Sequence, residues 1–180
     1  MRIQLVLVGR TMPGFNELLT YVHKQFRAHV SLQFIDFPMT RAFRKERNQY
    51  EAEVLLHDLV RLTAPEADRT VFITREDIFS KPLNFVFGLA AGNSCIVSTA
   101  RLDPRFYGEL KDAAQASEAI ALFHERLVKE VVHELGHTLG ISHCDDKKCV
   151  MVFSNSIHDV DFKGKVFCEN CDKLLGLMQK

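Results

Sequence analysis

Three histidines and one glutamate near the C-terminal end carry the strongest chemical signal in the sequence. From His133 to His143 the chain reads H-E-L-G-H-T-L-G-I-S-H. Residues four apart lie on one face of a helix, so His133 and His137 can hold one metal ion from adjacent turns. Gly140 can adopt the left-handed conformation that ends a helix, which allows His143 to turn back as a third ligand. Three protein ligands leave one position for water, as in catalytic zinc sites.

The residue beside the first histidine completes the chemistry of a hydrolase. Zinc lowers the pKa of its bound water to about 7, and Glu134 can take the proton as the water attacks a scissile carbonyl. A bare H-E-x-x-H occurs by chance on amphipathic helices, whereas the further Gly and His at fixed offsets make the motif specific. We predict a zinc metallopeptidase of unknown natural substrate. The choice between endopeptidase and aminopeptidase stays open, since Asp103 or Glu109 could bind a free amine only by conjecture.

Four of the five cysteines form a second group, after the third histidine. Cys144 and Cys149 are separated by four residues, and Cys168 and Cys171 form a C-x-x-C pair. Two such pairs can make a four-thiolate zinc site, which is closed to water and therefore structural. Two disulfides, or a redox-active pair at 168 and 171, are the alternatives. The sequence thus predicts two zinc ions per chain, one catalytic and one structural.

The remaining cysteine and histidines lack metal-ligand spacing. Cys95 stands alone in an apolar run and is interpreted as a core residue. Five histidines are interpreted as ordinary surface or packed residues: His23, His29, His57, His124 and His158.

Alternating strand and helix signals surround these groups. A Gly-Asn turn at 92–93 predicts an antiparallel hairpin, and the long active-site helix is expected to begin with Ser117 as its N-cap and to end at Gly140. The basic start of the segment 41–62 is interpreted as a solvated surface. The expected strands cover residues 2–8, 31–37, 70–74, 84–90 and 94–98, and the expected helices cover 15–26, 41–62 and 117–140.

Composition limits the partners that the chain can have. A length of 180 residues with 47% hydrophobic residues suits one domain with one sizeable core. The 23 basic and 23 acidic side chains cancel, which argues against nucleic acid and against an anionic membrane as partners. No run approaches the roughly 20 apolar residues of a membrane helix, and the N-terminus is typical of a strand rather than a signal peptide. We expect a cytoplasmic monomer that acts on a peptide or protein.

The chain resembles the archaemetzincins. The resemblance rests on the zinc motif that runs directly into Cys144, on Cys144-x4-Cys149-x-Met151, and on the later Cys168-x-x-Cys171, with smaller similarities at residues 84–88 and 97–102. It implies a metzincin-like α+β fold, with a mixed twisted sheet over an active-site helix and a small zinc-bound C-terminal lobe. One catalytic domain would span residues 1–180, with an N-terminal subdomain at 1–143 and the lobe at 144–180.

The resemblance also implies roles for individual residues. His133, His137 and His143 would hold the catalytic zinc, Glu134 would be the base, and Met151 would form an apolar floor beneath the zinc. The structural zinc would be held by Cys144, Cys149, Cys168 and Cys171.

Two further expectations concern the substrate. Phe153 stands where some other metzincins carry a tyrosine that reaches the catalytic site, so zinc must do more of the oxyanion stabilisation; Tyr107 is an alternative donor. The hairpin that contains Ser94–Ser98 precedes the active-site helix, as does the edge strand that binds extended peptides in metzincins. We expect substrate to add there as a strand.

A function from another class competes with the enzyme. A zinc-stabilised binding module could keep the catalytic outline and recognise protein segments with little or no turnover. The intact Glu134 argues against this alternative, because a pure binder has no evident use for a base beside an open zinc.

Overall fold

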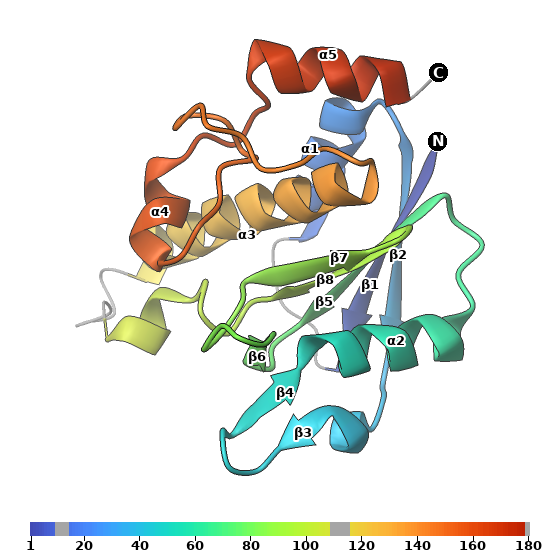
Figure 1. Ribbon diagram of the computed structural model, residues 1–180, viewed down its shortest axis with the longest axis vertical. Helices are drawn as coiled ribbons and strands as arrows, with labels where there is room; N and C mark the ends of the chain where they lie inside the picture. Colours follow the sequence, from blue (N-terminus) through green and yellow to red (C-terminus); the bar gives the residue numbers. More distant parts are fainter. Residues whose placement is uncertain (10–14, 109–115, 179–180) are drawn as a thin grey trace.

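A computed structural model gives the structure of residues 1–9, 15–108 and 116–178. In this part of the chain the main elements follow one another as alternating strands and helices, with helices at the C-terminal end (Figure 1). They are β1 (Arg2–Val8), α1 (Phe15–Phe26), β2 (His29–Ile35), α2 (Ala52–Thr63), β5 (Arg69–Thr74), β7 (Gly88–Ala91), β8 (Ser94–Ser98), α3 (Ala116–Thr138), α4 (Ile157–Phe162) and α5 (Glu169–Met178).

The central sheet is mixed. Its strand order is β2-β1-β5-β8-β7, in which the first four strands are parallel and β7 pairs antiparallel with β8. The antiparallel hairpin predicted around the Gly-Asn turn is confirmed, and Gly92 has the positive φ of 58° that this turn needs. The predicted fold class, α+β with a mixed sheet over an active-site helix, is also confirmed.

Apolar side chains cover both faces of the sheet. On β1, Ile3, Leu5 and Leu7 pack in a core cluster with α1 and α3, whereas Val6 and Val8 pack in a second cluster with α2. This alternation follows from the two-residue period of a strand. Figure 1 shows α2 on one side of the sheet and α1 with α3 on the other. The sheet therefore presents α3 with a buried apolar surface along the helix.

The C-terminal segment shares the larger of these two clusters. Cys149, Met151, Phe167 and Leu175 are buried in it together with residues of α1 and α3. The segment after residue 143 is therefore packed into the same core as α3. A division into a subdomain and a lobe at this point stays a prediction.

The region 41–62 differs from the expectation of one long helix. Only α2 is α-helical there, and the residues before it form a short 3-10 helix, η1 (Met39–Ala42), and two short strands, β3 (Phe43–Arg44) and β4 (Gln49–Glu51). These strands join β6 (Ile78–Phe79) in a second, three-stranded sheet. The basic start of the segment lies on the surface as expected: Arg41, Lys45 and Arg47 are exposed, and Arg41 pairs with Asp58 at 2.7 Å. The apolar residues at helical spacing belong to α2 alone, and the residues before Ala52 pair as strands instead.

Other boundaries also differ from the expected ranges. The second strand begins at His29 and ends at Ile35, two residues earlier than expected. The strand expected at 84–90 starts only at Gly88, because the residues before it leave the ladder and form a wall of the cleft described below. Ser117 lies inside α3, so its assignment as N-cap is wrong.

Candidate active site and metal centres

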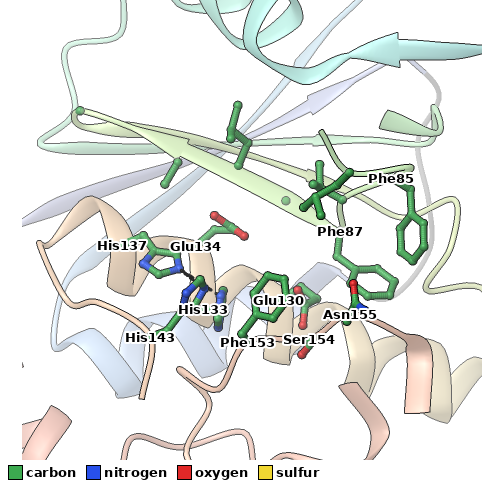
Figure 2. Close-up of a pocket in the computed structure, with 16 residues that line it drawn as sticks. Phe85, Phe87, Glu130, His133, Glu134, His137, His143, Phe153, Ser154 and Asn155 are labelled. Carbon is green, nitrogen blue, oxygen red and sulfur yellow. Dashed lines mark hydrogen bonds between the residues drawn. The ribbon is translucent and has the colours of Figure 1, made fainter. Parts of the chain in front are cut away.

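Helix α3 carries the first two histidines on one face and ends immediately after them. The Gly140 N–H donates to His137 O and the Ile141 N–H donates to Gly136 O, while Gly140 has a φ of 82°. These are the bonds of a left-handed helix C-cap. The cap reverses the chain as expected and brings His143 back beside the helix (Figure 2).

The three imidazoles converge through their Nε2 atoms. His137 Nε2 lies 3.1 Å from His133 Nε2 and 3.2 Å from His143 Nε2. Nitrogens that share a tetrahedral zinc at bonds of about 2.05 Å are separated by about 3.3 Å. The predicted histidines therefore lie together with the spacing that one zinc ion requires.

Hydrogen bonds on the far side of two rings fix their orientation. His133 Nδ1 donates to Val150 O and His137 Nδ1 donates to Ile141 O, each at 2.8 Å. Because a carbonyl only accepts, Nδ1 carries the proton and Nε2 keeps its lone pair for a metal. Burial lowers the pKa of all three rings, most strongly that of His133, where the Lys163 ammonium adds to the effect. Each ring is thereby held in the neutral form that binds metal.

Glu134 lies between the histidines and strand β7 (Figure 2). Its carboxyl group packs so closely on Gly88 that a Cβ built there would lie 2.5 Å from Glu134 Cγ and from Oε1. Burial raises the pKa of Glu134 well above its usual range, and the charge of Glu130 raises it further. A raised pKa suits a group that must accept a proton and later return it.

A cleft opens beside these residues. It has a volume of about 360 Å³, and its walls come from β7 and the residues before it, from α3, and from the loop that follows Met151. The cleft therefore lies between the histidines and the edge of the sheet.

Strand β7 forms that edge, whereas Ser94–Ser98 lies inside the sheet between β5 and β7. The Ser98 N–H donates to Phe87 O, and hydrogen bonds in an antiparallel ladder join alternate residue pairs. The N–H and C=O groups of Gly88 and Ala90 therefore point away from β8. A substrate strand would pair with β7, so the expected binding position shifts to the outer strand of the predicted hairpin.

Met151 and Phe153 support the histidines from below and from the side. A Cβ on Gly136 would lie 2.5 Å from Met151 Sδ, so the methionine packs directly beneath the catalytic helix. The ring of Phe153 contacts His143 edge-on, with centroids 5.1 Å apart. Met151 therefore lies where an apolar floor was expected, and Phe153 packs on the third histidine.

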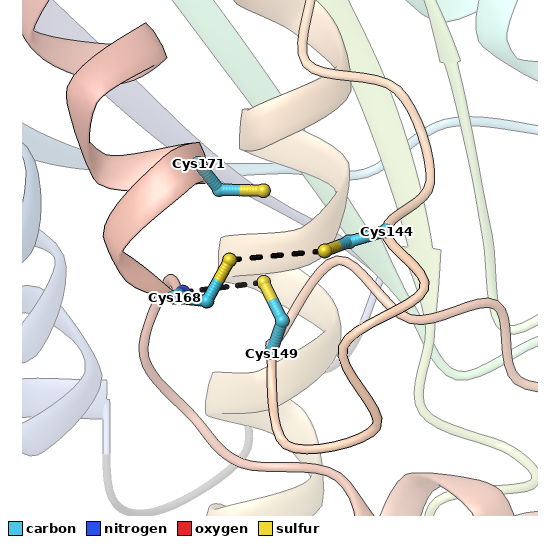
Figure 3. Close-up of side chains that lie close together, drawn as sticks. All are labelled: Cys144, Cys149, Cys168 and Cys171. Carbon is cyan, nitrogen blue, oxygen red and sulfur yellow. Dashed lines mark hydrogen bonds between the residues drawn. The ribbon is translucent and has the colours of Figure 1, made fainter.

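The four predicted cysteines also lie together (Figure 3). Cys144 Sγ and Cys168 Sγ are 3.7 Å apart, well beyond a disulfide bond, and all four sulfurs lie within 4.8 Å of one another. Sulfurs around a tetrahedral zinc at about 2.3 Å are separated by about 3.8 Å. Backbone N–H groups of Met151 and Cys168 point at Cys149 Sγ, an arrangement that stabilises thiolates.

The two groups are connected by the segment between them. The Cys144 N–H donates to Met151 O at 3.0 Å, and Val150 supplies the carbonyl that orients His133. The Val150 N–H in turn donates to Val166 O, shortly before Cys168. The backbone from Cys144 to Met151 therefore carries two of the predicted cysteine ligands and also the Val150 carbonyl that accepts the hydrogen bond of His133.

Other residues singled out in the sequence lie elsewhere. Cys95 is fully buried in β8, where burial and the charge of Glu134 raise its pKa, as expected for an inert core thiol. Asp103 caps the short 3-10 helix η2 (Pro104–Tyr107) and pairs with Arg105, while Tyr107 packs on Phe106. Glu109 lies outside the described residues. The other five histidines belong to neither metal-ligand group in the part of the chain that the structure describes.

Two features of the site have no signal in the sequence. Gly88 is needed for the close approach of Glu134. In the sequence it has no feature that distinguishes it from any other glycine in a strand. Lys163 forms a buried ion pair with Glu130, at 2.8 Å, although the two residues are far apart in the chain. Only the folded arrangement brings these pairs together.

Most of the chain matches known proteins. The family model described as peptidase family M54 matches residues 22–176. The archaemetzincin of Sulfolobus acidocaldarius is 46% identical over 140 residues, which cover 77% of this chain and 75% of the relative. The archaemetzincin of Methanopyrus kandleri is 37% identical over 188 residues and covers 97% of this chain and 95% of its own length.

Solved structures extend the similarity to the whole fold. The crystal structure of the Methanopyrus kandleri archaemetzincin superposes with a TM-score of 0.82 at 36% identity, and covers 99% of this chain and 94% of that one. A structure described as a zinc-dependent peptidase from Methanocorpusculum labreanum has a TM-score of 0.80 at 30% identity, and covers 96% and 99% of the two chains.

Proposed function

The chain belongs to peptidase family M54, the archaemetzincins, and we propose that it hydrolyses peptide bonds with a water molecule activated by Glu134 as general base. Family membership makes it a zinc metallopeptidase. The observation that carries the mechanism is the position of Glu134, which is held against Gly88 beside three converging imidazoles. His133, His137 and His143 would hold the zinc ion. When bound, that ion acidifies water and polarises a carbonyl oxygen.

The chain's own residues account for the proton transfers. Glu134 is 5% exposed and lies at the cleft, so its carboxylate can take a proton from the attacking water and deliver it to the leaving amine. The hydrogen bonds from His133 and His137 to backbone carbonyls keep both rings from rotating. No tyrosine lines the cleft within the described residues, and Phe153 cannot donate a hydrogen bond.

The substrate would lie along the outer edge of β7. The free backbone groups of Gly88 and Ala90 can pair with an extended peptide, which would place its carbonyls over the histidines. We propose peptide or protein segments as substrates on this ground. Pairing through backbone groups does not itself choose between endopeptidase and aminopeptidase action.

A second zinc ion would be held by Cys144, Cys149, Cys168 and Cys171. The sulfur spacing and the N–H groups that point at Cys149 support a closed, structural site. The left-handed turn at Gly140 and the position of Met151 support placement in the metzincin clan.

A monomer in the cytoplasm, without nucleic-acid or membrane partners, remains our proposal from the sequence. It rests on the zero net charge and on thiols grouped for metal binding. No described helix has the length and apolar character that crossing a membrane requires.

The test is a digest of a diverse peptide library by the zinc-loaded protein, read by mass spectrometry. Glu134→Gln keeps the shape of the side chain and removes the base, so cleavage should fall by about 10² to 10⁴-fold. Glu118→Gln, an exposed change on the same helix, is the matched control and should cleave normally. Zinc content of each variant is measured in parallel. Equal cleavage by Glu134→Gln would refute Glu134 as the general base. No cleavage by the wild type with both zinc ions present would favour the binding-module alternative.

A further inference from the structure

The face of α3 that leads to His133 carries buried charge. Charged side chains are rarely buried unless they are paired. Three of them nevertheless precede His133 on one helical face, at positions i, i+3 and i+4 with the histidine at i+7, and none is more than 3% exposed. They are Arg126, Lys129 and Glu130. The end of α4 packs on this face and supplies their partners.

The first two of these residues hold α4 in place. Arg126 donates through Nε and Nη2 to the two carboxylate oxygens of Asp161, each at 2.7 Å. Lys129 Nζ donates to Val160 O at 3.0 Å and to Asp161 O at 3.1 Å. Lys163, which caps the C-terminal end of α4, is thereby brought against α3.

Lys163 joins this contact to the metal centre. Its Nζ lies 2.8 Å from Glu130 Oε1 as a buried ion pair and 3.4 Å from His133 Nδ1. The same Nζ lies 3.5 Å from Val152 O. One ammonium therefore contacts the helical turn before His133, the ring of His133 and the segment that follows Met151.

His133 Nδ1 has two polar neighbours of opposite kind. The Val150 carbonyl, 2.8 Å away, only accepts a hydrogen bond, whereas the Lys163 ammonium only donates. With its proton on Nδ1, the ring donates to Val150 and keeps the Nε2 lone pair for a metal. With the proton on Nε2, the ring would accept from Lys163 and could not bind a metal through Nε2. The two neighbours therefore favour different tautomers of the ring.

The carboxylate of Glu130 is the stronger partner of the ammonium. It is nearer to Lys163 Nζ than His133 Nδ1 is, and hydrogen bonds between ionised groups are about twice as strong as neutral ones. While Lys163 is paired with Glu130, its ammonium gains little by turning to the ring. Without that carboxylate the buried ammonium needs another acceptor, and His133 Nδ1 is within reach.

We propose that Glu130 is a positioning residue for the catalytic metal centre, which acts through Lys163 to keep His133 in the tautomer that binds zinc. Glu130 needs no contact with metal or substrate in this role. The ion pair also ties the segment that follows Met151 to α3, because Lys163 reaches Val152 O. This inference concerns the metal centre of the proposed peptidase and rests on that function.

The first experiment measures the zinc affinity of the histidine centre by competition with a chelator. Glu130→Gln keeps the shape of the side chain and removes its charge. Losing a residue that orients a ligating histidine weakens metal binding by about 10- to 100-fold, and we expect a loss in that range. Cobalt in place of zinc assigns the loss to one centre, because cobalt bound by thiolates absorbs differently from cobalt bound by imidazoles. Wild-type affinity in a folded Glu130→Gln protein would overturn the inference.

Removing the ammonium as well tests the route through Lys163. Glu130→Gln/Lys163→Met has no cation to compete with Val150, so it should recover most of the lost affinity although it lacks the ion pair. A double variant that binds zinc as weakly as Glu130→Gln would contradict the proposal. If Glu130→Gln does not fold, Glu130→Asp takes its place and draws the carboxylate back by one methylene group. A smaller loss of affinity is then expected, and no loss would again count against the proposal.

Asp161→Asn is the matched control for a purely structural effect. It removes the carboxylate partner of Arg126, another buried cation on the same face of α3, two turns before His133. The control should lower Tm as Glu130→Gln does, yet leave the zinc affinity of the histidine centre unchanged. An equal loss of zinc affinity in Asp161→Asn would show that affinity follows stability alone, which would reject the positioning role.

Metal affinity separates this inference from the proposed function, because it is measured without a peptide. A wild type that cleaves no peptide, together with the expected affinities of the variants, would reject the peptidase mechanism and keep the positioning role of Glu130. Cleavage by the wild type, together with unchanged zinc affinity in Glu130→Gln, would reject the positioning role alone.

Discussion

Replacing Gly88 by alanine tests the placement of the general base without touching a titratable group or a metal ligand. Gly88 has no positive φ, so alanine is compatible with the backbone there. The new methyl group would lie 2.5 Å from Glu134 Cγ and 2.6 Å from Cδ. Carbon atoms in contact are normally about 3.5 to 4.0 Å apart. The Glu134 side chain must therefore retreat by about 1 Å or more.

The size of the effect follows from that displacement. A misplacement of about 1 Å at a reacting group can cost about 10²-fold in rate. Overpacking a buried contact costs about 1 to 3 kcal/mol of stability. For a chain of this length, that cost lowers Tm by roughly 2 to 12 °C. Zinc content should not change, because Glu134 is not placed as a ligand.

The assay combines peptide-cleavage kinetics, zinc analysis and thermal unfolding. Gly176→Ala is the matched control, since a Cβ at Gly176 in α5 meets nothing within 4 Å. That variant should keep wild-type kcat/KM and gain up to about 1 kcal/mol of helix stability. If Gly88→Ala retained the wild-type kcat/KM, the position of Glu134 against β7 would not matter for catalysis and the reasoning would be refuted.

Three other changes probe the strand, the third histidine and the cysteines. Ala90→Pro removes an outward N–H and should raise KM while zinc content stays unchanged; an unaltered KM would reject substrate pairing at β7. Phe153→Tyr adds a hydroxyl beside His143 and should raise kcat, whereas an unchanged rate and zinc geometry would show that this position is irrelevant. Cys171→Ser should lose one zinc ion per chain and lower Tm, while Cys95→Ala should retain both ions.

The parts of the fold that could be predicted from the sequence are those with a strong local pattern. The bounds of α1 and β8 match the expected ranges because apolar residues there recur at one clear period. The short strands β3, β4 and β6 were missed, since two or three residues carry no period. Their pairing depends on segments that lie far apart in the chain, such as β4 with β6.

The candidate site also has parts that could be predicted from the sequence and parts that could not. The metal-ligand groups could be predicted because zinc imposes ligand types and spacings that are visible along the sequence. Glu130 and Lys163 could not, since a charged residue in a sequence is usually exposed and only the packing of α3 against residue 163 buries this pair. The requirement for glycine at 88 arises likewise from the approach of a helix side chain to a strand.

The connection between the two metal-ligand groups explains why a small cysteine-rich segment would accompany a catalytic helix. Val150 O holds the ring of His133, and Met151 O accepts the N–H of Cys144. A Cβ on Gly164 would lie 2.3 Å from Lys148 O, so the chain after α4 also packs tightly on this segment. Metal bound by the cysteines would restrain the backbone at both of its ends. The orientation of a catalytic ligand would then depend on a metal that takes no part in the reaction.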